Sequence, residues 1–171
     1  MISYQPALDR FHALFRMSCL LAAFPENYPI EAGKFRILDF YMVFPFRLKD
    51  FIFKQGQTGL KRVGRAYGYT QPYGGVPDDT ALFLRMAPMQ ILAMDTLAAH
   101  DMIDREDYAR DAIRLGDERA PPELAERTAA FIEEHGDLVS TLRTLAGEYA
   151  FLGEDGLKRR SGLMEYKYDV V

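Results

Sequence analysis

The spacing of apolar residues along the chain predicts a mainly helical protein. The first pattern covers residues 6–24 and begins at a proline. It places Leu8, Phe11 and Phe15 on one stripe at helical spacing, and it places Arg16 on the polar side. We therefore expect an amphipathic helix here, with its apolar stripe toward the core and Arg16 toward solvent.

Proline and glycine divide much of the remaining chain into further helices. A helix over residues 30–44 is expected to stop at Pro45, which opens the next helix over 46–54. Two helices are expected near the C-terminal end, and their bounds are Pro121 to Gly136 and Asp137 to Gly153. The second of these has its apolar residues in register at Leu138, Leu142, Leu145 and Tyr149.

The segment from residue 78 to about residue 101 is interpreted as two helices. Asp78 or Asp79 can cap the first helix, and Pro88 interrupts it and starts the second. No run in the whole sequence approaches the roughly 18 apolar residues that a membrane-spanning helix needs. We therefore expect no membrane association.

Two segments predict a minor β element. Residues 56–77 contain six glycines and two prolines, which is typical of an irregular loop or a short β-hairpin. Residues 163–170 alternate polar and apolar side chains, which predicts one β-strand. Its backbone needs a partner strand, either in this chain, near 62–72, or in another protein. The predicted partner-binding strand includes Glu165, Tyr166, Lys167 and Tyr168.

Charge is distributed unevenly along a chain whose net charge is −4. Residues 1–70 hold ten Lys and Arg against five Asp and Glu, whereas the remainder holds eleven against twenty. We expect a single domain over 1–171, with a basic half at 1–77 and an acidic helical half at 78–171. This difference in charge between the two halves indicates either two faces that bind different partners or head-to-tail self-association. An equally supported alternative is that both halves simply have solvated surfaces.

The basic half contains the strongest candidate binding residues. Its cations are Arg47, Lys49, Lys54, Lys61, Arg62 and Arg65, and three tyrosines follow them. A helix, a turn, a basic helix and a glycine-rich hairpin form the outline of a winged helix-turn-helix. The expected fold class is therefore mainly α, winged-helix-like, with a minor β-hairpin or strand. The cations would contact either DNA phosphates or an acidic protein surface.

No segment has the residues and spacing of a catalytic or metal site. Cys19 is the only cysteine and lies in an apolar stretch, and the three histidines are not paired at metal-ligand spacing. GQTGLK at 56–61 lacks the spacing of a phosphate-binding loop. The residue types of a metal-dependent nuclease motif are present in Asp78, Glu165 and Lys167. Asp78 is, however, better interpreted as a helix cap. We expect no enzyme activity, no metal and no cofactor.

Four segments resemble a known protein family. They are LDRFHALFRMSCLL at 8–21, GKFRILDFYMVFPFRLKDF at 33–51, PMQILAMDTLAAHDMID at 88–104 and SGLMEYKYDVV at 161–171. This chain resembles the middle component of three-component systems built around an ABC-type ATPase, which include Lamassu-type defence systems against phage. The resemblance covers most of the chain and includes no catalytic signature.

The resemblance implies a non-enzymatic accessory subunit that bridges an SMC-like coiled-coil ATPase and a separate effector, in the cytoplasm. The alternative is a free-standing winged-helix DNA-binding regulator, and a weaker third hypothesis is a metal-dependent nuclease. A neighbouring gene for a coiled-coil ATPase would favour the first hypothesis. DNA binding by the isolated chain would favour the second, and metal-dependent cleavage the third.

Overall fold

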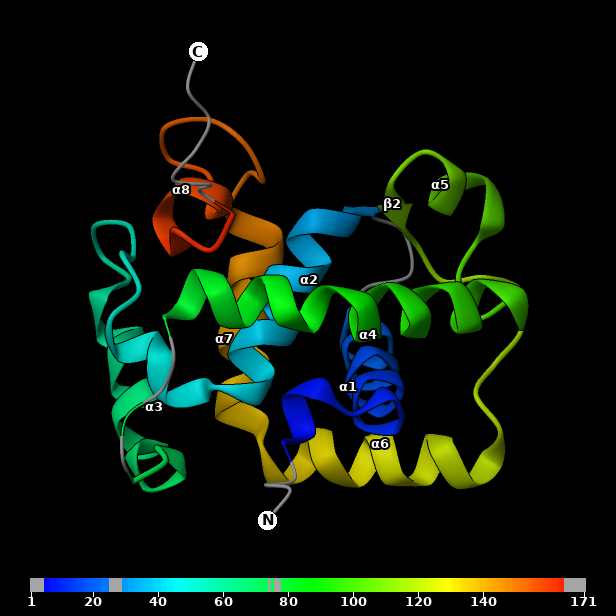
Figure 1. Ribbon diagram of the computed structural model, residues 1–171, viewed down its shortest axis with the longest axis horizontal. Helices are drawn as coiled ribbons and strands as arrows, with labels where there is room; N and C mark the ends of the chain where they lie inside the picture. Colours follow the sequence, from blue (N-terminus) through cyan, green and yellow to red (C-terminus); the bar gives the residue numbers. More distant parts are fainter. Residues whose placement is uncertain (1–4, 25–28, 74, 76–77, 165–171) are drawn as a thin grey trace.

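The computed structural model describes residues 5–24, 29–73, 75 and 78–164, and over these residues the chain is mainly α-helical (Figure 1). The α-helices are α1 (Arg10–Ala23), α2 (Ala32–Val43), α3 (Lys61–Ala66), α4 (Asp79–Ala99), α5 (Arg105–Ala109), α6 (Pro122–Glu134), α7 (Gly136–Glu148) and α8 (Leu157–Ser161). Short 3-10 helices are η1 (Pro6–Leu8), η2 (Pro45–Lys49), η3 (Thr58–Leu60) and η4 (Gly68–Thr70).

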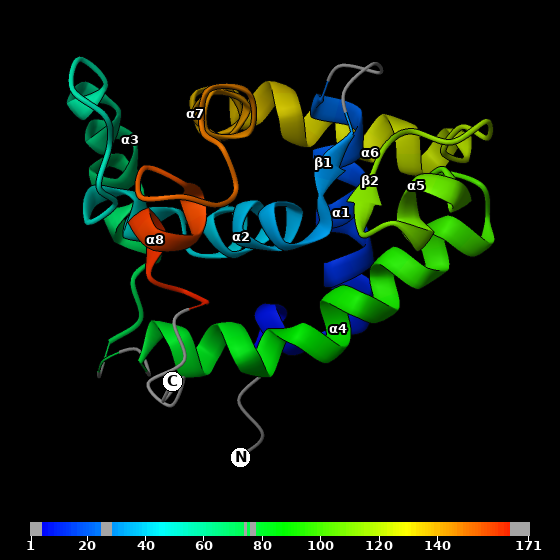
Figure 2. The same cartoon turned by 90° about the horizontal axis from the view of Figure 1, so that it is seen from above.

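The core lies between helices from both halves of the chain. Helix α1 packs against α4 and α6, and α2 packs against α7, α8 and η2. Figures 1 and 2 show α4 crossing one face of the molecule, α6 and α7 on the opposite face, and α3 at one end. A small antiparallel sheet joins β1 (Ile30–Glu31) to β2 (Ala112–Ile113) beside the start of α2.

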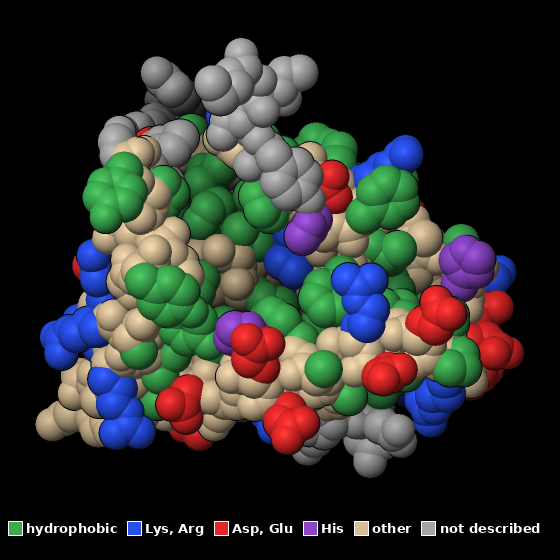
Figure 3. All heavy atoms as spheres, turned by 90° about the horizontal axis from the view of Figure 1, so that it is seen from below, with side chains coloured by type: hydrophobic (Ala, Val, Ile, Leu, Met, Phe, Trp, Pro, Cys, Tyr) green, Lys and Arg blue, Asp and Glu red, His purple; other side chains and the backbone are tan. Residues whose placement is uncertain are grey.

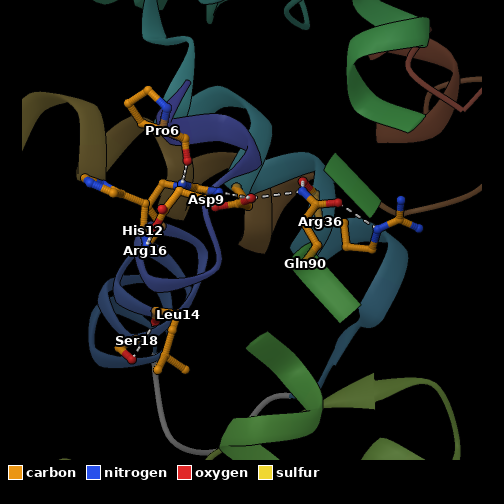
Figure 4. Close-up of polar contacts among 9 residues, drawn as sticks. Pro6, Asp9, His12, Leu14, Arg16, Ser18, Arg36 and Gln90 are labelled. Carbon is orange, nitrogen blue, oxygen red and sulfur yellow. Dashed lines mark hydrogen bonds and ion pairs between the residues drawn. The ribbon is translucent and has the colours of Figure 1, made fainter. Parts of the chain in front are cut away.

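A buried polar network connects three of the core helices (Figure 4). The fully buried carboxylate of Asp39 on α2 accepts two hydrogen bonds from Arg16 on α1, from Nε at 2.7 Å and from Nη2 at 3.1 Å. It also accepts one from Gln90 Nε2 on α4, at 2.9 Å. Arg36 Nε donates to Gln90 Oε1 at 2.9 Å, and Arg16 Nη1 donates to the carbonyl of Pro6 at 2.9 Å. Each charged group in this network therefore has a partner.

This network corrects the sequence-based orientation of α1. Arg16 was expected on the solvent side, but it is only 6% exposed, whereas Phe11 of the predicted apolar stripe is 67% exposed. The buried face of α1 instead includes Met17 and Leu20. Asp9 sets the start of the helix, since its Oδ1 accepts from the backbone N–H groups of Phe11 and His12, each at 2.9 Å.

Helix α4 is one continuous helix, so the predicted interruption at Pro88 is wrong. Pro88 removes one backbone hydrogen bond from α4. The helix continues past Pro88 because it packs along α1 and because the Gln90 side chain donates hydrogen bonds to α2. By length and composition alone, α4 could therefore cross a membrane, although core helices of globular proteins pass the same test.

Several sequence-based boundaries are confirmed. Asp78 caps α4, where its side chain accepts from the Ala81 N–H at 3.1 Å. The helix that follows Pro121 and the helix that begins beside Asp137 are present as α6 and α7. The predicted apolar register of α7 is buried throughout, at Leu138, Leu142, Leu145 and the adjoining Tyr149.

The winged-helix arrangement is not confirmed. Among its described residues, the glycine-rich segment 56–77 forms η3, α3 and η4 where a loop or a β-hairpin was expected. Residues 62–72 are largely helical, so they do not offer the strand that was expected to pair with the C-terminal tail. The predicted tail strand itself, from Glu165 onward, lies outside the described residues. The described minor β element is β1 with β2, together with a bridge between Ile103 and Leu115.

We expect Asp39→Asn to lower the free energy of unfolding by about 3–5 kcal/mol, because Arg16 would stay buried without a counter-charge. Urea denaturation followed by circular dichroism measures this change. The matched control is Asp117→Asn at an exposed position, where we expect a change within about 0.5 kcal/mol. Equal stabilities for the two variants would contradict the role given to the network.

The structure also predicts an unreactive cysteine. Burial raises the pKa of Cys19 from 9.0 to about 12, with the Arg16 charge acting in the opposite direction. At about pH 8, a thiol reagent should label the folded protein far more slowly than the urea-unfolded protein, because the thiolate is the nucleophile. The raised pKa also means that this thiol contributes less stability as the pH rises above 9.0. Immediate stoichiometric labelling of the folded chain would contradict this placement.

Candidate partner-binding surface

Helix α3 forms the end of the molecule and is positioned by close contact with η2. Gly64 is buried against η2, and a Cβ at this position would lie 2.8 Å from the carbonyl carbon of Leu48. Val63 is also buried, at 5% exposure. Because residues 63 and 64 face η2, the basic residues on either side of them are directed away from the core.

Three of the six predicted binding cations lie on this outward surface. Arg62 and Arg65 are exposed and Lys61 is half-buried. The side chains of these three residues make no hydrogen bond and no ion pair with a residue that the structure describes. We call Lys61, Arg62 and Arg65 the α3 basic surface. With their charges not neutralised locally, they are available to an anionic partner.

Arg47 has an internal partner. Its Nη2 lies 2.9 Å from Asp79 Oδ1 at the start of α4, and its guanidinium lies 5.3 Å from the centroid of the Phe46 ring. Burial raises the pKa of Asp79, and the charge of Arg47 opposes that shift. Arg47 therefore joins η2 to α4, and its charge is largely compensated within the fold.

Lys49 and Lys54 are also engaged by the chain itself. Lys49 Nζ donates to Gln71 Oε1 at 3.4 Å. Lys54 Nζ donates to the backbone carbonyl of Glu148 and lies 4.5 Å from the centroid of the Tyr149 ring. The structure thus separates the six predicted cations into three that hold η2 and its flanking residues in place and three that face outward.

Exposed tyrosines adjoin the α3 basic surface. Tyr69 is 79% exposed and Tyr73 is fully exposed. Tyr67 stacks on Tyr69 with ring centroids 6.0 Å apart, and its hydroxyl lies 2.7 Å from Nδ1 of His135 at the junction of α6 and α7. Tyr67 therefore anchors η4, while Tyr69 and Tyr73 remain available for contact with another molecule.

Figure 3 shows the charge separation on the face seen from below, with Lys and Arg side chains at the end that holds α3 and Asp and Glu side chains along α6. The same face is hollowed between α1, α6 and η4, where an apolar cavity of about 360 Å³ is lined by residues that include His12, Phe15 and Phe131. A cleft of about 570 Å³ lies between α1 and α6 and is lined mainly by apolar residues. Neither was apparent from the sequence, because each is assembled from distant segments.

Acidic residues and histidines that could serve catalysis or metal binding have structural roles wherever the structure describes them. Asp78 caps α4 and Asp104 caps α5, and a hydrogen bond from the N–H of Asp107 chiefly lowers the pKa of Asp104. His100 and His135 are the C-terminal caps of α4 and α6. Among the described residues, no group of His, Cys, Asp and Glu could hold a metal ion. Glu165, Tyr166, Lys167 and Tyr168 lie outside the described part of the chain.

Residues 2–169 match the family model of ABC-three component (ABC-3C) system Middle Component 5. Neither a curated protein nor a solved structure matches the chain.

We expect Gly64→Ala to displace α3, because the added methyl group would overlap the backbone of η2. Overpacking of this kind costs about 1–3 kcal/mol, partly offset by the roughly 1 kcal/mol by which alanine favours a helix. Hydrogen exchange of residues 61–66 should become faster. Gly59→Ala is the matched control, since nothing lies within 4 Å of a Cβ at that position. Equal exchange in the two variants would show that α3 is not positioned by this contact.

Proposed function

Because the protein belongs to the Middle Component 5 family of ABC-three component systems, we propose that it is a non-enzymatic accessory subunit that bridges the other components of such a system. The name of the family implies partnership with those components. We further propose that they are an SMC-like ABC ATPase and a separate effector, and that the complex acts in antiviral defence of the Lamassu type.

The observation that carries this proposal is the α3 basic surface. Lys61, Arg62 and Arg65 have no ionic partner among the described residues, and the exposed rings of Tyr69 and Tyr73 lie next to them in the chain. Cations beside exposed aromatic rings are a composition typical of protein interfaces. The surface is therefore suited to an acidic patch on a partner subunit.

A protein partner fits this surface better than a DNA groove. Helix α3 has only six residues and lies against η2 along its Gly64 side, so it is too short and too close to the body to serve as a recognition helix. Most apolar residues around η2 face the core, with Phe46, Phe51 and Phe53 buried and Ile52 exposed. The alternative of a winged-helix DNA-binding regulator therefore has less support and serves as an outcome of the experiment below.

The absence of enzyme activity and the cytoplasmic location are also part of the proposal. Support for the first comes from the carboxylates and histidines described above, which cap helices or form ion pairs. Support for the second comes from the single, buried cysteine, which cannot form a disulfide within the chain. We also retain the proposal that the tail residues Glu165, Tyr166, Lys167 and Tyr168 add a strand to a partner protein.

We expect the triple reversal Lys61→Glu, Arg62→Glu and Arg65→Glu to weaken assembly with the ATPase at least about tenfold, because cations facing an acidic surface become like charges. Co-purification and a titration of the two purified subunits measure this. The matched control reverses Arg110, Lys158 and Arg159, which changes the net charge by the same amount at other surface positions. Equal binding by both triple variants would contradict the proposed surface.

DNA binding by the isolated chain, measured across a salt series, separates the alternative function. For an accessory subunit we expect weak binding that the triple reversal hardly changes. If the cations contact phosphates, removal of each one lowers the slope of log affinity against log salt by about one unit. Tight, salt-steep DNA binding by the isolated chain, together with normal assembly of the reversed variant, would favour the regulator.

A further inference from the structure

Helix α4 presents an exposed and mostly apolar face along its whole length. In Figure 1 this helix crosses the side of the molecule nearest the viewer. The exposed residues of α4 are Ala81, Leu84, Arg85, Pro88, Ile91, Leu92, Asp95 and Ala99. With 3.6 residues per turn, all of them fall within an arc of about 120°, opposite the buried residues that pack toward the core. Leu84, Ile91 and Leu92 are 40%, 45% and 44% exposed, which is unusual for three neighbouring large apolar side chains.

The order of residues on this face is self-complementary in the antiparallel direction. Reversing α4 about position 90 brings Ala81 opposite Ala99, Arg85 opposite Asp95, and Pro88 opposite Leu92. These six positions lie within an arc of about 80° on the helix surface. The two charged residues thus have opposite signs at equivalent distances from the centre, and the two ends carry small side chains that allow close approach.

We propose that two copies of this protein associate through α4, antiparallel across a twofold axis that passes near position 90. In such an isologous contact each pair occurs twice. Pro88, Leu92 and the flanking Ile91 would form an apolar centre. Arg85 of each copy would lie beside Asp95 of the other.

The two charged side chains on the exposed face of α4 can make these contacts. The guanidinium of Arg85 makes no hydrogen bond or ion pair with a described residue. Asp95 accepts a hydrogen bond from the Tyr108 hydroxyl through Oδ1, at 2.5 Å. Oδ2 accepts no hydrogen bond from a described residue and can receive one from an arginine.

This contact would leave the α3 basic surface uncovered. Helix α3 lies at one end of the molecule, whereas α4 crosses a broad face (Figures 1 and 2). The inference concerns self-association and does not rest on the proposed function. A dimer built in this way would present two α3 basic surfaces, one on each copy.

Sedimentation equilibrium of the full chain over a range of concentrations tests the proposal. We expect the unchanged protein to dimerise reversibly. Arg85→Glu alone and Asp95→Arg alone should each raise the dissociation constant by about tenfold or more, because like charges then meet at two symmetric places. Leu92→Glu, at an exposed position that folding should tolerate, should abolish the dimer by placing two charges at its apolar centre.

Mixing the two single variants gives the sharpest result. In a dimer of R85E alone, the carboxylate introduced at position 85 faces the native carboxylate of Asp95 on the other copy. In a mixed dimer it faces the guanidinium that D95R introduces, and the remaining native Arg85 faces the remaining native Asp95. The symmetry of the contact therefore predicts that an equimolar mixture of R85E and D95R dimerises about as tightly as the unchanged protein, although each variant alone dimerises more weakly. The double variant R85E/D95R should dimerise by itself for the same reason.

Tyr108→Phe is the matched control, since it removes the internal hydrogen bond of Asp95 and leaves both charges of the face in place. It should dimerise like the unchanged protein, and thermal unfolding confirms that each variant is folded. A monomer at all concentrations would overturn the proposal, as would a dimer insensitive to L92E and to both charge reversals. Dimerisation that appears only after deletion of residues 165–171 would also overturn it, because the tail would then be the occupant of this face.

Discussion

The rest of the structure depends on the compensation of one buried negative charge. Asp39 is fully inaccessible to solvent, and an ionised carboxylate in that position must receive hydrogen bonds and a counter-charge from the protein. Arg16 supplies the counter-charge from α1, and Gln90 supplies a further donor from α4. The consecutive helices α1 and α2 and the more distant α4 are therefore held in one relative arrangement. Apolar packing alone would permit several arrangements at similar cost, because it has little directional preference.

The surfaces of the molecule follow from this arrangement. Asp39 fixes α2, and the chain leaves α2 directly into η2, on which α3 rests through Gly64. Arg47 then joins η2 to the beginning of α4 through Asp79. The basic end and the apolar face of α4 are thus connected to the same buried carboxylate through a short series of contacts. A change in the core would alter both surfaces together.

Local signals allowed much of the fold to be predicted from the sequence. Helix α7 was recognisable because its leucines follow the helical period, and Asp78 was recognisable as a cap because capping depends only on the next few residues. Arg16 was misplaced because its burial depends on Asp39, twenty-three positions later, and no local pattern reveals that pair.

Long-range contacts also explain the remaining differences. Segment 56–77 was misjudged because its glycines were interpreted as turn residues, whereas Gly64 serves close packing. The site was predicted only in part for a similar reason, since the partners of Arg47 and Lys54 come from α4 and from the end of α7.

The uninterrupted path of α4 has a consequence for how this chain can vary in length. Asp79 near one end meets η2, and Gln90 near the middle meets Asp39, so the number of residues between them is as important as their identity. One inserted residue would rotate the two positions relative to each other by about 100° and separate them by about 1.5 Å. Neither contact could then be kept without breaking the other. Insertions and deletions in related chains should accordingly be confined to the connections between helices, and α4 should keep a constant length.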